Sequence, residues 1–430
     1  MIIHVALALA LASSPSPKSN WLIWVQQEEK EPPTPEAIWK MVDDGEAGKL
    51  KEALGDTAKL VQSLKAGRPL GDAPAGERRE RYADLFGRES DVWIVVPRKY
   101  DKSKPAGILV LLHGLGATGA QHKDLYRGFA EANNYILLAP TAQPEPPEDR
   151  NEDYAESLRG VKLPHWWSYR NGNIVFSSIS ELKKTHAVDE NRIVLLGYSM
   201  GGFGAWNIGL RYPDRWSAIV SLAGGFSRNE YKARYEVDEK ARKLHGNGFN
   251  LPAYIVHGDV DETVPVEFAR ESRNQMKKLG FEHQYVEIQK GKHLLNLREG
   301  GVILNDLEKW LKTRVRKAHP KEVRHYAIGD YCPRSYWLKI EQFGTPSAEI
   351  KASIKDQVID FTHTGVKKAT FYVDETLLDL SKPIKVTSGK EVLFEGTLEP
   401  SFDVLLESWR VREDREMLFR AKVTVEFKAP

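Results

Sequence analysis

The chain has 430 residues, enough for two or three domains, and 41% of them are hydrophobic, which is sufficient for sizeable cores. With 28% charged residues, this composition excludes a mainly disordered chain, a collagen-like fibre and a polytopic membrane protein. The 62 Lys and Arg residues nearly balance the 60 Asp and Glu residues, so the chain lacks the basic excess of nucleic-acid binders. Cys332 is the only cysteine, which excludes an internal disulfide and a zinc site built on several thiolates.

The N-terminus begins with an apolar run, residues 2–12, that ends in small residues. The run is too short to cross a bilayer as a helix, but it fits the apolar stretch of a signal peptide with a cleavage site near 10–12. No Lys or Arg precedes the run, which is unusual for such a signal. We expect residues 1–20 to be a signal peptide and the protein to be secreted or periplasmic. If this segment is not a signal peptide, we expect a cytoplasmic protein.

Residues 21–84 are expected to form an N-terminal helical extension. Apolar side chains recur at roughly helical spacing between Ala37 and Lys65. Prolines precede this pattern, and a connector rich in Gly and Pro follows it at 67–76. We expect the extension to pack on a core formed by the rest of the chain.

Strands and helices alternate over residues 85–317. The expected strands are 92–97, 107–114, 135–140, 192–197, 216–224, 252–258 and 283–289. The expected helices are 120–132, 174–186, 200–211, 265–279 and 294–315. Continuous apolar strands separated by helices indicate an α/β domain, in which a mostly parallel sheet is covered by helices on both faces.

The pattern changes in residues 318–430, where short strand-like runs follow one another closely. This pattern predicts a C-terminal all-β domain that resembles a sandwich. Its aromatic residues could form a carbohydrate-binding platform, although aromatics at alternating strand positions more often belong to a core. The aromatic residues in question are Tyr336, Trp337, Phe361, Tyr372 and Trp409.

The motif Gly197-Tyr198-Ser199-Met200-Gly201 lies between an expected buried strand and an expected helix. The pattern G-x-S-x-G is weak by itself, but this setting places a serine on a sharp strand-to-helix turn, where it projects beyond the sheet. Neighbouring glycines are needed there because side chains would clash. We therefore predict that Ser199 is a nucleophile, and a packing turn with an inert serine is the alternative.

A serine nucleophile needs a base, and on this type of turn the acid and the histidine follow the serine in chain order. Asp259 and Asp261 lie in the loop after the expected strand 252–258. His293 follows the next expected strand and precedes a helix. Because the carboxyl ends of parallel strands meet at one edge of a sheet, we expect His293 and one of these acids to lie beside Ser199.

The run Gly114–Gly119 matches G-x-G-x-x-G between a strand and a helix, which is the context of a dinucleotide-binding turn. The next strand, however, ends in Ala-Pro-Thr at 139–141, with no acidic residue to hold a ribose. In acyl transfer, a backbone N–H of this loop instead joins the N–H after the nucleophile to form an oxyanion hole. We therefore assign the oxyanion hole to the amides of Leu115 and Met200, and we expect His113 to orient the loop.

The sequence gives no metal signature: H-E-x-x-H is absent, and the histidines follow no ligand spacing. We therefore expect neither a metal nor another cofactor. The expected partner is a small-molecule or polymer-linked ester, with no nucleic acid and no membrane span, and the oligomeric state is left open.

Four motifs, taken in order, resemble those of the α/β-hydrolase superfamily. They are LLHGLG at 111–116, GYSMGGFGAW at 197–206, HGDVDETVP at 257–265 and GKH at 291–293. Within this superfamily, the chain is most similar to bacterial esterases of the feruloyl-esterase and polyhydroxybutyrate-depolymerase type, and to prolyl-oligopeptidase-like hydrolases. The resemblance covers about 85–317.

The resemblance selects the acid, because the family pattern HGxxDxxVP corresponds to Asp261. It implies a triad of Ser199, Asp261 and His293 in a serine hydrolase that cleaves carboxylic esters through an acyl-enzyme. Two alternatives remain: a serine peptidase of the prolyl-oligopeptidase-like type, and an inactive hydrolase core whose β domain binds carbohydrate.

The segment 141–172 connects a strand to the next helix and is long enough to form a lid or a binding loop. It contains the adjacent Trp166 and Trp167. We expect one of these tryptophans to line an acyl or aromatic pocket, and hydrophobic packing beneath the loop is the equally weighted alternative.

Overall fold

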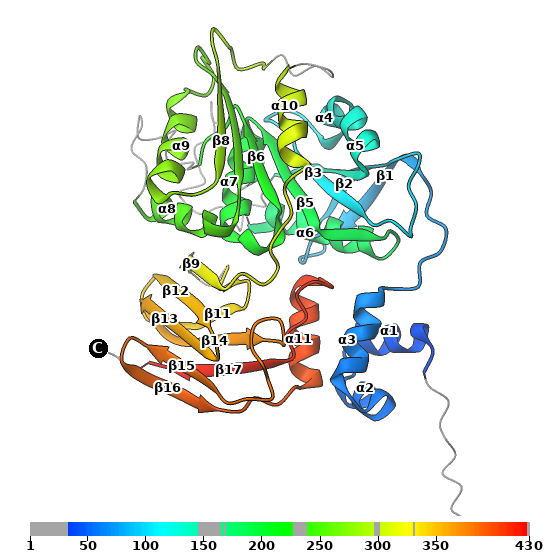
Figure 1. Ribbon diagram of the computed structural model, residues 1–430. Helices are drawn as coiled ribbons and strands as arrows, with labels where there is room; N and C mark the ends of the chain where they lie inside the picture. Colours follow the sequence, from blue (N-terminus) through cyan, green and yellow to red (C-terminus); the bar gives the residue numbers. More distant parts are fainter. Residues whose placement is uncertain are drawn as a thin grey trace, which may run out of the picture.

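The computed structural model describes residues 33–144, 165–166, 169–226, 239–295, 302–329 and 332–427. The expected signal peptide lies outside these residues. Figure 1 shows an α/β part, a β-rich C-terminal part beside it and a group of N-terminal helices next to the C-terminal part.

An eight-stranded sheet forms the centre of the α/β part, with the strand order β1-β2-β4-β3-β5-β6-β7-β8 (Figure 1). The strands in numerical order are Gly76–Ala83, Glu89–Val96, Ala106–Leu112, Tyr135–Pro140, Val188–Tyr198, Ala218–Leu222, Ala253–Gly258 and His283–Ile288. β2 is antiparallel to β1 and β4, and the other neighbouring pairs are parallel. Every residue of β3, β4, β6 and β7 is buried, as expected for strands covered on both faces. The predicted fold class is therefore confirmed.

Helices cover both faces of this sheet. They are α4 (Gly119–His122), α5 (Arg127–Asn133), α6 (Tyr169–Lys183), α7 (Met200–Arg211), α8 (Glu239–Leu244), α9 (Glu267–Leu279) and α10 (Val302–Leu311). Val175 of α6, Trp206 of α7 and Met276 of α9 belong to one buried core. Ala130 of α5 and Leu307 of α10 belong to a second core. The sheet therefore separates two hydrophobic layers.

The sheet begins before the expected domain boundary at 84/85. β1 pairs with β2 along its whole length, from Gly76 opposite Val96 to Ala83 opposite Glu89. The sequence of β1, GERRERYA, is almost entirely polar, so it carries no apolar strand signal. Charged side chains are typical of an edge strand, because they discourage pairing with other chains.

The N-terminal extension is helical, as predicted, and its helical pattern is divided into three short helices. They are α1 (Pro35–Asp44), α2 (Ala47–Leu54) and α3 (Thr57–Ala66). Gly45 and Gly55, which end α1 and α2, have φ angles of 69° and 73°, a conformation that glycine adopts without steric cost. Trp39 and Leu60 share a buried core with Leu405 of the C-terminal part. The extension therefore packs on α11 of the C-terminal part, in a core separate from that between its two sheets.

The C-terminal part contains a four-stranded sheet, β10-β11-β14-β17, and a five-stranded sheet, β16-β15-β13-β12-β9. Its strands are β9 (Glu322–Ile328), β10 (Arg334–Ser335), β11 (Leu338–Phe343), β12 (Ser347–Lys355), β13 (Val358–Thr364), β14 (Val366–Val373), β15 (Ile384–Ser388), β16 (Glu391–Gly396) and β17 (Ala421–Glu426). Phe361 of one sheet and Phe371 of the other belong to one core, with ring centroids 5.1 Å apart. The predicted β-rich domain is confirmed, with one correction: it also contains the helix α11 (Phe402–Arg412).

The aromatic residues considered for a carbohydrate platform are all buried. Their exposed fractions lie between 0% and 6% for Tyr336, Trp337, Phe361, Tyr372 and Trp409. They form hydrophobic cores and offer no face to a polysaccharide, so the structure contradicts this platform.

Buried ion pairs join the C-terminal part to the α/β part. Arg412, at the end of α11, contacts Asp214 at 2.6 Å, and Arg316 contacts Asp414 at 2.6 Å. Burial opposes the ionisation of Asp214, but Arg412 and Arg215 outweigh this effect and lower the pKa of its carboxyl. Because Asp214 precedes β6, the C-terminal part is fastened near the amino ends of the parallel strands.

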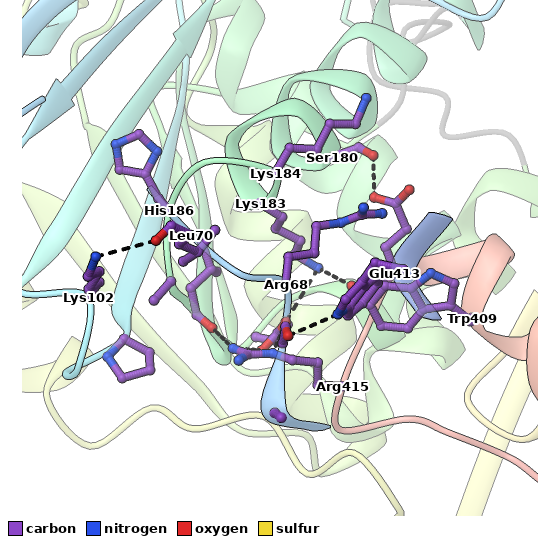
Figure 2. Close-up of a pocket in the computed structure, with 17 residues that line it drawn as sticks. Arg68, Leu70, Lys102, Ser180, Lys183, Lys184, His186, Trp409, Glu413 and Arg415 are labelled. Atoms are coloured by element: carbon purple, nitrogen blue, oxygen red, sulfur yellow. Dashed lines mark hydrogen bonds and ion pairs between the residues drawn. The ribbon is translucent and has the colours of Figure 1, made fainter. Parts of the chain in front are cut away.

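A cavity of about 370 Å³ lies where the N-terminal helices, the end of α6 and the chain after α11 meet (Figure 2). Arg415 binds Glu190 through two hydrogen bonds of 2.9 Å, and Lys183 donates to the backbone oxygen of Glu413 at 2.9 Å. Glu190 is the third residue of β5, whereas Ser199 follows the other end of that strand. The cavity is therefore remote from the predicted nucleophile.

Replacing Arg412 with Met should lower the free energy of unfolding by about 3 kcal/mol, because the buried carboxylate of Asp214 would lose the guanidinium that contacts it. Urea unfolding measures this loss. The control is Lys368→Met, which removes an exposed ion pair with Glu426 and should cost less than about 1 kcal/mol. Equal losses in the two variants would contradict a stabilising role for the buried pair.

Candidate active site

Ser199 lies on a sharp turn between β5 and α7, with φ 55° and ψ −117°. A Cβ atom on Gly197 would lie 1.8 Å from the backbone oxygen of Gly201, and a Cβ atom on Gly201 would lie 1.9 Å from the backbone oxygen of Leu112. Both positions therefore require glycine. The Ser199 N–H donates to the oxygen of Leu222 at 2.8 Å, which fixes the turn against the neighbouring strand β6.

Three side chains that are distant in the sequence meet at this turn. The Oγ atom of Ser199 lies 2.9 Å from Nε2 of His293, and Nδ1 of His293 lies 2.7 Å from Oδ2 of Asp261. Ser199 follows β5, Asp261 lies in the loop after β7, and His293 lies in the loop after β8. The chain thus places the hydroxyl, the imidazole and the carboxylate in the hydrogen-bonded order of a Ser-His-Asp triad. Asp261, and not Asp259, provides the carboxylate beside His293.

The carboxylate of Asp261 is buried and accepts hydrogen bonds at both oxygens. Oδ1 accepts from the backbone N–H groups of Thr263 and Val264, each at 2.8 Å. Oδ2 lies 3.2 Å from Nε2 of His257, in addition to its contact with His293. Burial alone would raise the pKa of Asp261, but these hydrogen bonds, led by that of His257, lower it to about 2. The carboxylate can therefore orient the imidazole and stabilise an imidazolium.

His257 is a residue of the site that the sequence analysis missed. It lies near the end of β7 with no exposed surface, and its Nε2 atom is 2.8 Å from the backbone oxygen of Val264. A proton on Nε2 can be donated both to this oxygen and to Asp261, which closes the acid loop. The signal was its position in the run HGDVD, but only the folded loop shows that the side chain turns toward the acid.

The loop after β3 passes directly beside the nucleophile. A Cβ atom on Gly114 would lie 3.4 Å from Cβ of Ser199, which is ordinary van der Waals contact and shows how closely the loop packs on the nucleophile turn. Leu115 follows in this loop, and Met200 is the first residue of α7. The first N–H groups of a helix have no acceptor within the helix and are available to an oxyanion. That the N–H groups of Leu115 and Met200 together bind an oxyanion remains a prediction.

His113 holds this loop through both ring nitrogens. Nδ1 lies 2.8 Å from the oxygen of Gly114, and Nε2 accepts the N–H of Ala142 at 3.0 Å. Burial lowers the pKa of His113 to about 4, so the ring is neutral at physiological pH, with its proton on Nδ1. These two hydrogen bonds place His113 where it can orient the loop after β3, as expected.

Trp166 takes a packing position beneath the loop and not a place in a pocket wall. It is fully buried, and its Nε1–H donates to the oxygen of His113 at 2.9 Å. A Cβ atom on Gly204 of α7 would lie 2.3 Å from Cβ of Trp166, so the indole packs closely on that helix. The prediction that Trp166 contacts the substrate is therefore wrong, and the alternative of hydrophobic packing holds for this residue. Trp167 lies outside the described residues.

Two further findings bear on the expected partners. Across the described ranges, no group of three or more His, Cys, Asp or Glu side chains could hold a metal ion. Among the same residues, no helix combines the length and the apolar character needed to cross a membrane.

Residues 97–311, half of the chain, match the sequence model of the phospholipase/carboxylesterase family. The chain belongs to this family. The predicted relation to α/β-hydrolases is thereby confirmed, and the molecule is a member of a hydrolase family.

Individual relatives are distant. Acyl-protein thioesterase 1 of Emericella nidulans is 24% identical over 229 residues, which are 48% of this chain and 90% of that protein. "Probable dipeptidyl-peptidase 5" of the same organism is 21% identical over 284 residues, which are 56% of this chain but only 37% of that protein. An S-formylglutathione hydrolase structure from Agrobacterium tumefaciens is 18% identical with a TM-score of 0.44, and the match covers 57% of this chain and 98% of that one.

Asp261→Asn should alter the pH dependence of stability in a defined direction. The pKa of Asp261 is lowered from 3.8 to about 2. The ionised carboxylate therefore contributes fully to the free energy of unfolding above about pH 4, and this contribution is lost as the pH falls toward 2. Urea unfolding of both proteins between pH 2 and pH 7 should therefore show a stability difference that shrinks in acid. A difference that stays constant below pH 4 would contradict the lowered pKa.

Proposed function

We propose that this protein hydrolyses carboxylic esters through an acyl-enzyme intermediate on Ser199. The observation that carries the proposal is the 2.9 Å contact between Oγ of Ser199 and Nε2 of His293, with Asp261 on the opposite nitrogen. Membership of the phospholipase/carboxylesterase family supports the same chemistry.

The proposed reaction has two steps. His293 accepts the proton of Ser199 as Oγ attacks the ester carbonyl carbon, and the N–H groups of Leu115 and Met200 bind the resulting oxyanion. Collapse of this intermediate breaks the ester C–O bond, and the imidazolium gives its proton to the departing alcohol. Water, activated by His293, then attacks the acyl-enzyme and releases the acid. Asp261 remains ionised throughout and stabilises the imidazolium.

A peptidase would use the same triad, so the choice of bond rests on other observations. The thioesterase relative is matched over 90% of its length, whereas the peptidase relative is matched over 37%. The region shared with this chain thus corresponds to nearly all of a protein named for ester-type bonds. This difference favours esters over peptide amides.

Exposed aliphatic side chains lie next to the reacting groups in the sequence. Leu115 is 40% exposed in the loop beside Ser199, and Leu294, directly after His293, is 81% exposed. Val260, next to Asp261, is 46% exposed. Apolar surface at such positions favours an uncharged acyl or alcohol group. We therefore propose an apolar ester as the substrate, and a feruloyl ester is one member of this class.

Ser199→Ala should lower kcat for short p-nitrophenyl esters by about 10⁴-fold or more, because the nucleophile is removed while the fold is retained. Feruloyl, acetyl and polyester substrates and a peptide p-nitroanilide complete the panel. Ser353→Ala, an exposed serine of the β-rich part, is the matched control and should retain full activity. Undiminished turnover by Ser199→Ala would refute the proposed nucleophile, and faster amide than ester cleavage by the wild type would favour the peptidase.

Leu294→Asp should lower kcat/KM for p-nitrophenyl hexanoate by about 10-fold and that for the acetate ester by less, because a longer acyl group loses more apolar contact. Val315→Asp is the control, since Val315 is also exposed, at 60%, but lies after α10. Equal losses for both esters would argue against an apolar subsite at Leu294.

A further inference from the structure

Tyr198, the last residue of β5, lies between the two loops that flank the nucleophile. A Cβ atom on Gly114 of the oxyanion loop would lie 3.3 Å from Cδ1 of Tyr198. The ring centroid of Tyr198 lies 5.6 Å from that of His122, in α4 after this loop, and 5.5 Å from that of His293. One aromatic ring thus contacts both sides of the site.

The hydroxyl of Tyr198 adds a directional contact. It donates a hydrogen bond of 2.7 Å to the backbone oxygen of His293, which also accepts the N–H of Leu295 at 2.9 Å. Burial, together with the nearby charge of Asp261, raises the pKa of Tyr198 to about 12, so the hydroxyl remains a donor at physiological pH. Since Tyr198 and Ser199 share a peptide bond, this hydrogen bond ties the histidine loop directly to the nucleophile.

We infer that Tyr198 is a positioning residue that holds the imidazole of His293 and the oxyanion loop in register with Oγ of Ser199. This inference rests on the proposed function. The hydroxyl restrains the backbone of His293, and the ring provides the surface against which Gly114 and His293 pack. A misplacement of reacting groups by about 1 Å can cost 100-fold in rate, so such a restraint acts on kcat.

The ring has a second consequence for the protonated state. In the reaction His293 becomes an imidazolium, and its ring centroid lies 5.5 Å from that of Tyr198, within the range of cation–π attraction. Removing the ring should therefore destabilise the imidazolium that forms during the reaction.

Tyr198→Phe and Tyr198→Leu separate the two contributions. Tyr198→Phe keeps the ring and loses the hydrogen bond, so kcat for a p-nitrophenyl ester should fall by about 5- to 10-fold with little change in KM. Tyr198→Leu should lower kcat further. Because the imidazolium then also loses the neighbouring ring, this further loss should again fall on kcat and not on KM.

Tyr254→Phe is the matched control, because it removes the hydroxyl of a buried tyrosine on β7 whose ring packs against Trp310. It should retain the wild-type kcat. Three results would overturn the inference: an unchanged kcat in both Tyr198 variants, an effect on KM alone, or an equal loss of kcat in Tyr254→Phe. In each case, ester hydrolysis by the wild type would still uphold the proposed function. A wild-type protein with no hydrolytic activity would reject both.

Discussion

The strained backbone of Ser199 is the constraint around which the carboxyl end of the sheet is arranged. Its φ angle of 55° is rare for a residue with a side chain, and such a conformation costs about 1–3 kcal/mol. The backbone approaches closely at Gly197 and Gly201, where any side chain would clash, and this close packing permits the turn. The result is a hydroxyl that projects from the sheet edge at which the loops carrying Asp261 and His293 also end.

The C-terminal part contacts the opposite end of this sheet, and the N-terminal helices pack on the C-terminal part. The pairs Arg412–Asp214 and Arg415–Glu190 connect the C-terminal part to residues near the amino ends of β6 and β5. The N-terminal helices pack on α11 through a shared buried core. The described contacts of both parts thus contribute to stability and leave the reacting groups to the α/β part. We therefore expect substitutions at these contacts to change stability and to leave the arrangement around Ser199 intact.

The order of the strands explains why much of the site could be predicted. In a parallel sheet, residues just after consecutive strands meet at one edge, so chain order alone brought Ser199 and His293 together. The choice between Asp259 and Asp261 required the resemblance to known hydrolases, because both lie in the same loop. The role of His257 depends on how that loop closes, which no local pattern records.

The sequence was least informative where tertiary contacts decide the outcome. β1 is a charged edge strand and has no apolar periodicity, so the sequence places its residues in the N-terminal extension and not in the sheet. α11 is a single helix among strands, and its buried face is completed by helices from the other end of the chain. Trp166 resembled a pocket residue because it lies in a long connection, yet it supports the loop through His113.

The most direct test of the central claim is to locate a covalent adduct on the nucleophile. The wild-type protein is treated with a fluorophosphonate, digested and mapped by mass spectrometry, and the labelling rate is compared with that of His293→Ala. We predict a single adduct on the peptide that contains Ser199, formed far more slowly when His293 is absent. An adduct on a different residue, or a labelling rate unaffected by His293→Ala, would contradict the account.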